Sequence, residues 1–171
     1  MSSTGEFDWD RDTWEVTDKY FDQPKILAHN QINSYNDFVD NMIPSLIKNH
    51  NPIVVGQDWD PETEKFRVRY EVEFNGQPYM SRPQINEGSG SVRDLYPNEA
   101  RLRGLSYSAF MYLDVTHRYY EGDNLIKEKK ESQIPFKLPC MLHSKYCYLE
   151  KNDAETRRQM GECPYDLGGY F

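Results

Sequence analysis

The stretch from Lys65 to Phe74 alternates between apolar and charged side chains over ten consecutive positions. Side chains of an extended strand point alternately to opposite faces, so this pattern predicts a strand with one buried face and one solvated face. Asn75-Gly76 follows directly, and this dipeptide favours the tight turn of a β-hairpin. We therefore predict a hairpin whose return strand is Tyr79–Arg82.

Other segments also have strand character. Ile53–Val55 is a short apolar run, and alternation returns over a long strand from Leu105 to Tyr119. The charged run Lys127–Lys130 indicates a turn or an edge ribbon. The prolines within 135–141 predict short strand pieces there, because proline is tolerated mainly at sheet edges.

One helix is predicted from the apolar stripe that begins at Tyr35 and ends at Ile47, with residues spaced three and four apart. Ser34 is a plausible N-cap. Pro44 lies inside the pattern and predicts a kink or a break, because proline lacks the amide hydrogen of the helical ladder.

Three shorter helices are predicted from residues that typically begin or end a helix. Asp12 with Glu15, and Asn152 with Glu155, have the spacing of capping boxes. Pro97 is suited to the first turn of a helix that Gly104 ends. Together with a flexible loop at residues 86–91, these elements predict an α+β fold with an antiparallel sheet, a β-hairpin and a few helices.

The composition suits a domain whose core is completed by other surfaces. The chain has 171 residues, of which 37% are apolar, and its mean hydropathy is -0.88. The net charge of -8 is the wrong sign for an independent nucleic-acid-binding protein. Residues 1–22 hold -5 of this charge and residues 23–171 hold -3, so any contact with DNA requires a local basic patch.

The cysteines indicate neither disulfides nor zinc. There are three of them, Cys140, Cys147 and Cys163, at irregular spacing without a Cys-x-x-Cys pair. Reduced intracellular thiols are the simplest interpretation. No apolar run is long enough to span a membrane, and the acidic first residues do not resemble a targeting sequence.

The final residues, Gly161–Phe171, contain the pair Gly168-Gly169 before two aromatic residues. Paired glycines allow a positive φ or a close backbone approach. We expect Tyr170 and Phe171 to begin a buried strand. A strand that ends after two residues has nothing to pair with, so we expect this chain to be a fragment of a longer protein.

Four ordered blocks resemble the second-largest (β) subunit of multisubunit DNA-directed RNA polymerases of the eukaryotic, archaeal and large-DNA-virus type. These blocks are Asn33–Val39, Leu95–Tyr107, Leu138–Leu149 and Gly161–Phe171. The family's subunit is several times longer, so the resemblance is to its amino-terminal part only.

The resemblance implies that residues 23–171 form the first part of the protrusion domain, behind an acidic extension at residues 1–22 that carries a short helix. The implied role is a scaffold that walls the cleft around DNA and the RNA–DNA hybrid, without catalytic residues of its own. The implied partners are the rest of the β subunit and the largest subunit. No metal or cofactor is implied for this segment, since the two Mg²⁺ ions of nucleotidyl transfer belong mainly to the largest subunit.

The isolated chain is expected to have no polymerase activity. The assembled enzyme is expected in the nucleus or cytoplasm, or in the virion or viral factory if the source is a large DNA virus.

Arg82, Arg101, Arg103 and Lys145 are the candidate residues near nucleic acid. For the arginines of the Glu99–Arg103 block the alternative is a structural salt bridge to Glu99 or Asp114, and for Arg82 it is a solvated strand end. His143 occupies a position where the family usually has arginine, which puts the family's ion pair there in doubt.

A second hypothesis remains open, in which the chain is a free-standing α+β interaction or regulatory module with a protrusion-like fold. The two hypotheses differ at the carboxyl end, because a free-standing protein is expected to finish in a capped helix or a polar tail.

Overall fold

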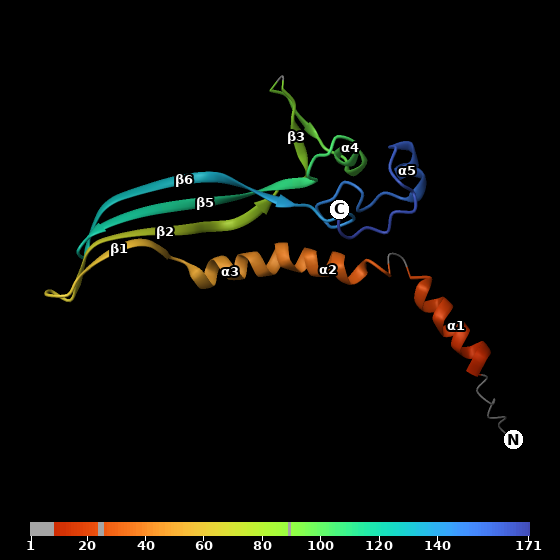
Figure 1. Ribbon diagram of the computed structural model, residues 1–171, viewed down its shortest axis with the longest axis horizontal. Helices are drawn as coiled ribbons and strands as arrows, with labels where there is room; N and C mark the ends of the chain where they lie inside the picture. Colours follow the sequence, from red (N-terminus) through yellow and green to blue (C-terminus); the bar gives the residue numbers. More distant parts are fainter. Residues whose placement is uncertain (1–8, 24–25, 89) are drawn as a thin grey trace.

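The computed structural model describes residues 9–23, 26–88 and 90–171 (Figure 1). The helices are α1 (Trp9–Phe21), α2 (His29–Asp37), the π-helical η1 (Phe38–Met42), α3 (Ile43–His50), α4 (Pro97–Leu102) and α5 (Ala154–Gln159). The strands are β1 (Ile53–Asp60), β2 (Lys65–Met80), β3 (Gln84–Asn86), β4 (Val92–Asp94), β5 (Ser108–Glu121) and β6 (Asn124–Pro139). No helix in the described part of the chain is both long and apolar enough to cross a membrane.

The main sheet has the order β1-β2-β5-β6, and all its neighbouring strands are antiparallel. The consecutive helices α2, η1 and α3 run beneath this sheet, while α4, α5 and the carboxyl end gather at one end of it (Figure 1). A small second sheet pairs β3 with β4 and projects from that same end. The predicted α+β fold with an antiparallel sheet is confirmed.

The hairpin predicted at Asn75-Gly76 is wrong. The chain does not turn back there, because β2 continues to Met80 and pairs with β5 on both sides of the dipeptide. Gly76 has a positive φ of 77°, which here serves a bulge between Asn75 and Tyr79. The hairpins of the main sheet join β1 to β2 and β5 to β6 instead.

The short strand pieces predicted at residues 135–141 are also wrong. They belong to β6, which pairs with β5 along its whole length from Asn124 to Pro139. Because β6 is an edge strand, Pro135 and Pro139 are tolerated in it. The same edge position confirms the interpretation of Lys127–Lys130 as part of an edge ribbon.

The predicted long helix is present but begins earlier. α2 starts at His29, so Ser34 lies inside it and is not the N-cap. Pro44 does interrupt the α-helical ladder: the turn before it is π-helical, and the amide of Ile43 donates to the carbonyl of Phe38. An extra residue in the turn accommodates the missing amide hydrogen of Pro44.

Two predicted caps are shifted. α1 begins at Trp9, which places Asp12 inside the helix and not at its start. α5 is capped by Asp153, whose side chain accepts a hydrogen bond from the amide of Thr156, and not by Asn152. The helix predicted after Pro97 is confirmed, and Gly104 follows its end with a φ of 63°.

The core lies where the sheet meets the loop after β6, residues 140–152, here called the central loop. Tyr107 is 2% exposed, and its hydroxyl donates to the Cys147 thiol at 3.4 Å. Its carbonyl accepts from the amide of Cys140 at 2.9 Å. The other core residues are Val39, Met80, Leu95, Ala100, Ala109, Met111, Leu142 and Leu149.

The carboxyl-terminal segment attaches to the central loop through Gly168 and Gly169. Their φ angles are 88° and 103°, and Gly169 exchanges two backbone hydrogen bonds with Leu142. The predicted need for glycine at this pair is therefore confirmed. The expectation of a buried aromatic strand is wrong, since Tyr170 is 80% exposed and Phe171 is 47% exposed.

Replacing Gly168 with alanine is expected to lower the free energy of unfolding by about 2 to 4 kcal/mol. A Cβ there would lie 2.8 Å from both the His143 Cβ and the Leu142 carbonyl oxygen, at a φ that disfavours side chains. Urea unfolding measures the loss. Gly88→Ala is the control, because a Cβ at Gly88 meets nothing within 4 Å. Equal stability of the two variants would contradict the role of the close approach.

Candidate functional site

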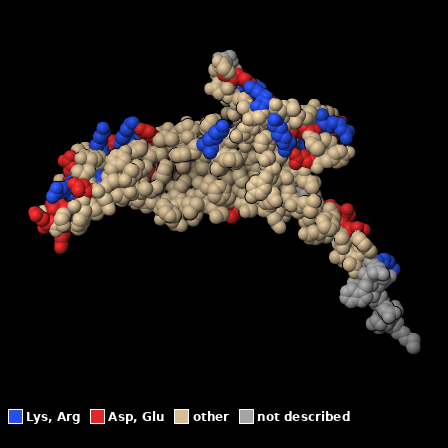
Figure 2. Space-filling model, viewed as in Figure 1, with Lys and Arg blue, Asp and Glu red and all other residues tan. Residues whose placement is uncertain are grey.

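Lys and Arg side chains gather mainly at two places, the tip of the main sheet and the opposite end where β3, α4 and α5 lie (Figure 2). The sequence-predicted residues belong to the second region. Arg82 lies between β2 and β3, Arg101 is in α4, Arg103 directly follows it, and Lys145 is in the central loop. They do not converge on one group, because each contacts a different partner.

Arg103 belongs to a four-residue charged cluster that we call the Glu–Arg cluster: Glu87, Arg93, Glu99 and Arg103. Its Nη1 atom lies 2.9 Å from Glu99 Oε1 and 3.0 Å from Glu87 Oε1. Arg93 also pairs with both carboxylates, with its Nη1 atom 2.7 Å from Glu99 Oε2. The salt bridge predicted between this block and Glu99 is confirmed. Two guanidinium groups and two carboxylates cancel, so the cluster adds no net charge.

The arginines change the acidity of the carboxylates they bind. Hydrogen bonds from Arg93 and then Arg103 lower the pKa of Glu99 from 4.5 to about 2, against a smaller opposing effect of burial. Hydrogen bonds from Arg103 and Arg93 also lower the pKa of Glu87. Both carboxylates are therefore ionised throughout the neutral range.

Arg101 is held more loosely. Its Nη2 atom lies 3.6 Å from Asp166 Oδ2, and its guanidinium lies over the Phe171 ring at 5.1 Å from the centroid. The side chain remains 41% exposed. A long ion pair and a stacked ring leave guanidinium N–H groups facing solvent, so Arg101 keeps donors for a further ligand.

Arg82 contacts an aromatic ring and no carboxylate. Its guanidinium lies 5.2 Å from the centroid of the Tyr148 ring, and the residue is exposed. Within residues 9–23, 26–88 and 90–171, no acidic side chain forms an ion pair with it. A cation over a tyrosine ring keeps its full charge, so Arg82 presents an unneutralised cation on the surface.

Lys145 fastens the central loop to the helices. Its Nζ atom lies 2.8 Å from Asp40 Oδ2, and its amide donates to Asn36 Oδ1 at 3.0 Å. The Tyr146 hydroxyl donates to the same Asp40 carboxylate at 2.5 Å. Hydrogen bonds from Lys145 and Tyr146 lower the pKa of Asp40. The contact observed for Lys145 is therefore structural.

His143 is buried and has a φ of 59°. Arg157 of α5 lies beside it, with Nη1 at 3.5 Å from His143 Nε2 and 2.7 Å from the Asp166 carbonyl oxygen. Since arginine only donates, Nε2 acts as the acceptor of this contact. Arg157 thus supplies a permanent cation next to the position where the family usually has arginine.

Sequence reasoning missed the partners of two arginines. Arg93 pairs with Glu87 and Glu99, six positions away on either side, and Arg157 donates to the Asp166 carbonyl oxygen, nine positions away. The spacing of Glu99 and Arg103, four apart near a helix, is the one local indication of the Glu–Arg cluster. The opposing residue Glu87 comes from the loop between β3 and β4.

The three thiols are free, and Cys140 and Cys147 are buried. Burial raises the pKa of the Cys140 thiol to about 12, so it stays protonated at neutral pH. Across the described ranges, no three His, Cys, Asp or Glu side chains form a group that could hold a metal ion.

The amino-acid sequence was compared with models of known protein families. The family described as RNA polymerase beta subunit matches residues 26–171. The chain belongs to this family. The resemblance read from the four sequence blocks is thereby confirmed.

Proteins similar to this chain occur in organisms as different as a plant and an archaeon. DNA-directed RNA polymerase II subunit 2 of Arabidopsis thaliana is 34% identical over 169 residues, which cover 94% of this chain and 14% of the relative. DNA-directed RNA polymerase II subunit RPB2 of Encephalitozoon cuniculi is 35% identical over 161 residues, covering 93% and 14%. DNA-directed RNA polymerase subunit Rpo2N of Methanothermobacter thermautotrophicus (strain Winter) is 37% identical over 161 residues, covering 94% and 28%. The chain therefore spans only a minor part of each relative.

In the Glu99→Gln variant the free energy of unfolding is expected to fall less as the pH is lowered than it does in the wild type. The pKa of Glu99 is lower in the folded chain than the ordinary 4.5, so its contribution is complete above about pH 4.5 and disappears as the pH falls toward 2. Urea midpoints measured from pH 7 to pH 2 should decline less in the variant, which should also be less stable at pH 7. Glu155→Gln serves as the control, because Glu155 forms only an exposed pair with Arg158. Parallel curves for wild type and Glu99→Gln would rule out the cluster as a source of stability.

Proposed function

We propose that this chain is a cleft-wall scaffold of DNA-directed RNA polymerase, forming the first part of the protrusion domain of the second-largest subunit. The observation that supports this most directly is the family match over residues 26–171, the part of the chain that contains the whole sheet and core. The proposal includes the division into an acidic extension at residues 1–22 and the protrusion segment at 23–171. Family membership favours this proposal over a free-standing regulatory module.

The construction of the sheet suits a stiff wall. β2 and β6 each run for 16 residues, and β5 between them for 14. Arg118 of β5 ties the neighbouring strands together, with Nη2 at 2.7 Å from Glu73 Oε2 and Nε at 3.1 Å from Glu128 Oε2. A half-buried arginine between two carboxylates on adjacent strands resists shearing of the strands past one another.

Partner subunits are expected to cover the apolar edges. Both outer strands of the main sheet expose apolar side chains, at Ile53, Val54 and Val55 of β1 and at Leu125, Ile126 and Phe136 of β6. Exposed apolar strand edges favour contact with further chain segments. The proposed partners are the rest of the same subunit and the largest subunit, in a nuclear or cytoplasmic enzyme.

The chemistry of RNA synthesis is assigned to other parts of the enzyme. The resemblance attributes the two Mg²⁺ ions to a site made mainly by the largest subunit, where they would clamp the attacking and leaving oxygens. The residues of this chain would position the walls of the cleft and would take no part in nucleotidyl transfer.

Among the candidate residues, Arg82 and Arg101 are the better proposals for contact with phosphate. Arg82 lies on a tyrosine ring without a carboxylate, and Arg101 has only a 3.6 Å ion pair. Arg103 and Lys145, by contrast, are already neutralised by carboxylates at 3.0 Å or less. An ion-paired side chain releases fewer counterions when a phosphate approaches, so it adds less to affinity.

A segment exchange tests the proposal. Residues 26–171 should replace the matching segment of the Methanothermobacter Rpo2N subunit, and the reconstituted polymerase should assemble and extend RNA on a DNA template. The 171-residue chain alone should incorporate no nucleotide. The same exchange carrying Gly168→Val, which fills the close approach to Leu142, should fail to assemble.

Nucleotide incorporation by the chain alone would refute the scaffold role. Failure of the unmodified exchange to assemble, while the unexchanged Methanothermobacter polymerase assembles and is active, would refute the assignment of the segment.

Arg82→Ala and Arg101→Ala are each expected to reduce the salt dependence of DNA binding by the chain. Each variant should lower the slope of log affinity against log salt by about 1, because one phosphate contact is lost. Fluorescence anisotropy with a labelled duplex between low and moderate salt measures the slope. Arg103→Ala should leave the slope unchanged, and an equal reduction in that variant would contradict the proposed ranking.

A further inference from the structure

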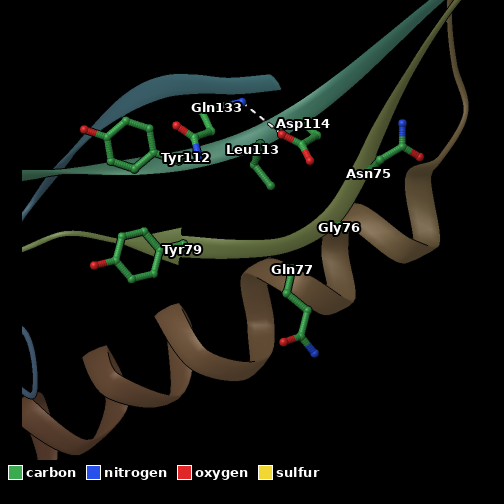
Figure 3. A pocket seen from close by; sticks show the side chains of 8 residues that line it. All are labelled: Asn75, Gly76, Gln77, Tyr79, Tyr112, Leu113, Asp114 and Gln133. Carbon is green, nitrogen blue, oxygen red and sulfur yellow. Dashed lines mark hydrogen bonds between the residues drawn. The ribbon is translucent and has the colours of Figure 1, made fainter. Parts of the chain in front are cut away.

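A pocket opens where β2 bulges away from β5, on the part of the sheet between its tip and the central loop (Figure 3). Its volume is about 320 Å³. The lining residues are Asn75, Gly76, Gln77, Tyr79, Tyr112, Leu113, Asp114 and Gln133. None of them takes part in the Glu–Arg cluster or in the proposed phosphate contacts, so the pocket is a separate feature.

The pocket exists because both neighbours of β5 are irregular at the same level. The pairing of β2 with β5 shifts between Asn75 and Tyr79, and the pairing of β6 with β5 shifts between Leu113 and Val115. Asp114 therefore sits in β5 between two bulges. Gln133, opposite it in β6, has a positive φ of 55°. Bulges redirect side chains and are frequent next to functional sites.

Asp114 is the only one of the eight lining residues that is charged at neutral pH. Its Oδ1 atom accepts a hydrogen bond from the Gln133 amide at 2.9 Å, which holds the carboxylate in place. Its Oδ2 atom faces Gly76, where a Cβ would lie 3.8 Å away. Within residues 9–23, 26–88 and 90–171, Oδ2 has no hydrogen-bond or ion-pair partner, so one oxygen of an oriented carboxylate is left for a ligand.

Two tyrosine rings line the same pocket, further along the strands from this carboxylate. Tyr79 and Tyr112 are stacked, with ring centroids 6.3 Å apart and planes inclined by 24°. Figure 3 shows the two rings side by side and Asp114 further along the same strand as Tyr112. Tyr112 and Asp114 are two apart on β5, so their side chains share a face and their Cα atoms lie about 7 Å apart. Tyr79 is 65% exposed and Tyr112 is partly buried, so the Tyr79 ring is the one more open to solvent.

We propose that this pocket binds an arginine side chain of a partner polypeptide. A carboxylate oxygen and the faces of two tyrosines are the groups that recognise a guanidinium, by a charge-assisted hydrogen bond and by cation–π contact. Arginine is favoured over lysine because its planar group both stacks on a ring and donates several hydrogen bonds in that plane. The side-chain amide of Gln133, which lies near Tyr112 in Figure 3, offers a further acceptor.

Charge complementarity selects a protein partner over nucleic acid. A pocket whose one charge is negative repels a phosphate and attracts a basic segment, and residues 23–171, which contain it, also carry a net charge of -3. The inference goes beyond the scaffold role and does not depend on any contact with DNA.

The probe is the blocked tripeptide acetyl-Gly-Arg-Gly-amide, compared with its lysine and citrulline counterparts. Titration into the isotopically labelled chain, followed by two-dimensional NMR, should give saturable shifts of the backbone amides of Gly76, Leu113 and Gln133. The dissociation constant for one side chain should be on the order of 1 mM. Lysine should bind more weakly, and citrulline, which lacks the charge, should not saturate.

The decisive variant is Asp114→Asn, which removes the charge but keeps an oxygen that can accept from the Gln133 amide. It should weaken arginine binding by about tenfold or more. Asp123→Asn, in the exposed turn between β5 and β6, removes the same charge elsewhere and should change nothing. Tyr79→Leu should also weaken binding, while Tyr79→Phe should not.

Several outcomes would overturn the proposal. They are equal weakening by Asp123→Asn and Asp114→Asn, citrulline binding as well as arginine, the absence of saturable shifts, and saturable shifts of the same amides with a thymidine oligonucleotide. Concentration-dependent shifts of these amides without peptide would also overturn it, since they would indicate a second copy of the chain as the occupant.

Discussion

The structure depends on the burial of the central loop, which joins the sheet, the helices α2 and η1 and the carboxyl-terminal segment. This loop has little regular structure, yet Leu142, Cys147 and Leu149 are each no more than 1% exposed. The sheet attaches to it through Tyr107, the helices through Asp40 and Lys145, and the carboxyl-terminal segment through Leu142 and Gly169. Buried backbone without regular structure must find hydrogen-bond partners. The Tyr107 carbonyl, the Asn36 side chain and the Gly169 carbonyl accept from the amides of Cys140, Lys145 and Leu142.

The charged residues of this polymerase subunit segment fall into two groups with different consequences. Arg93, Arg103 and Arg118 each bind carboxylates on other elements and hold the fold together. Arg82 and Arg101 are left with donors that face solvent. Because closely and loosely paired basic residues look the same in a sequence, the candidate set of four contains both kinds. The structure distinguishes them, because Glu87 and Glu99 neutralise Arg103 and Asp40 neutralises Lys145.

The wrong strand predictions share one physical cause. Asn75-Gly76 has the local preference for a hairpin, but Tyr79 and Met80 pair with Tyr112 and Met111 of β5, and this pairing keeps β2 extended. Its glycine then serves a bulge. The prolines of β6 likewise suggested short pieces, whereas an edge strand tolerates them because one side of its backbone needs no partner. Turn propensity is a local preference, and cross-strand pairing overrides it.

Sequence alone determined the family, the α+β class, the apolar stripe of the helices, the α4 turn before Gly104 and the need for glycine at 168 and 169. These features rest on ordered motifs or on preferences that act over a few neighbouring residues. Tertiary structure decided which carboxylate neutralises each arginine, where β2 bulges and which side chains surround Asp114. These contacts join residues from different elements, some more than 100 positions apart, as Lys145 and Asp40 are. Their partners are chosen by packing in three dimensions, which local patterns do not encode.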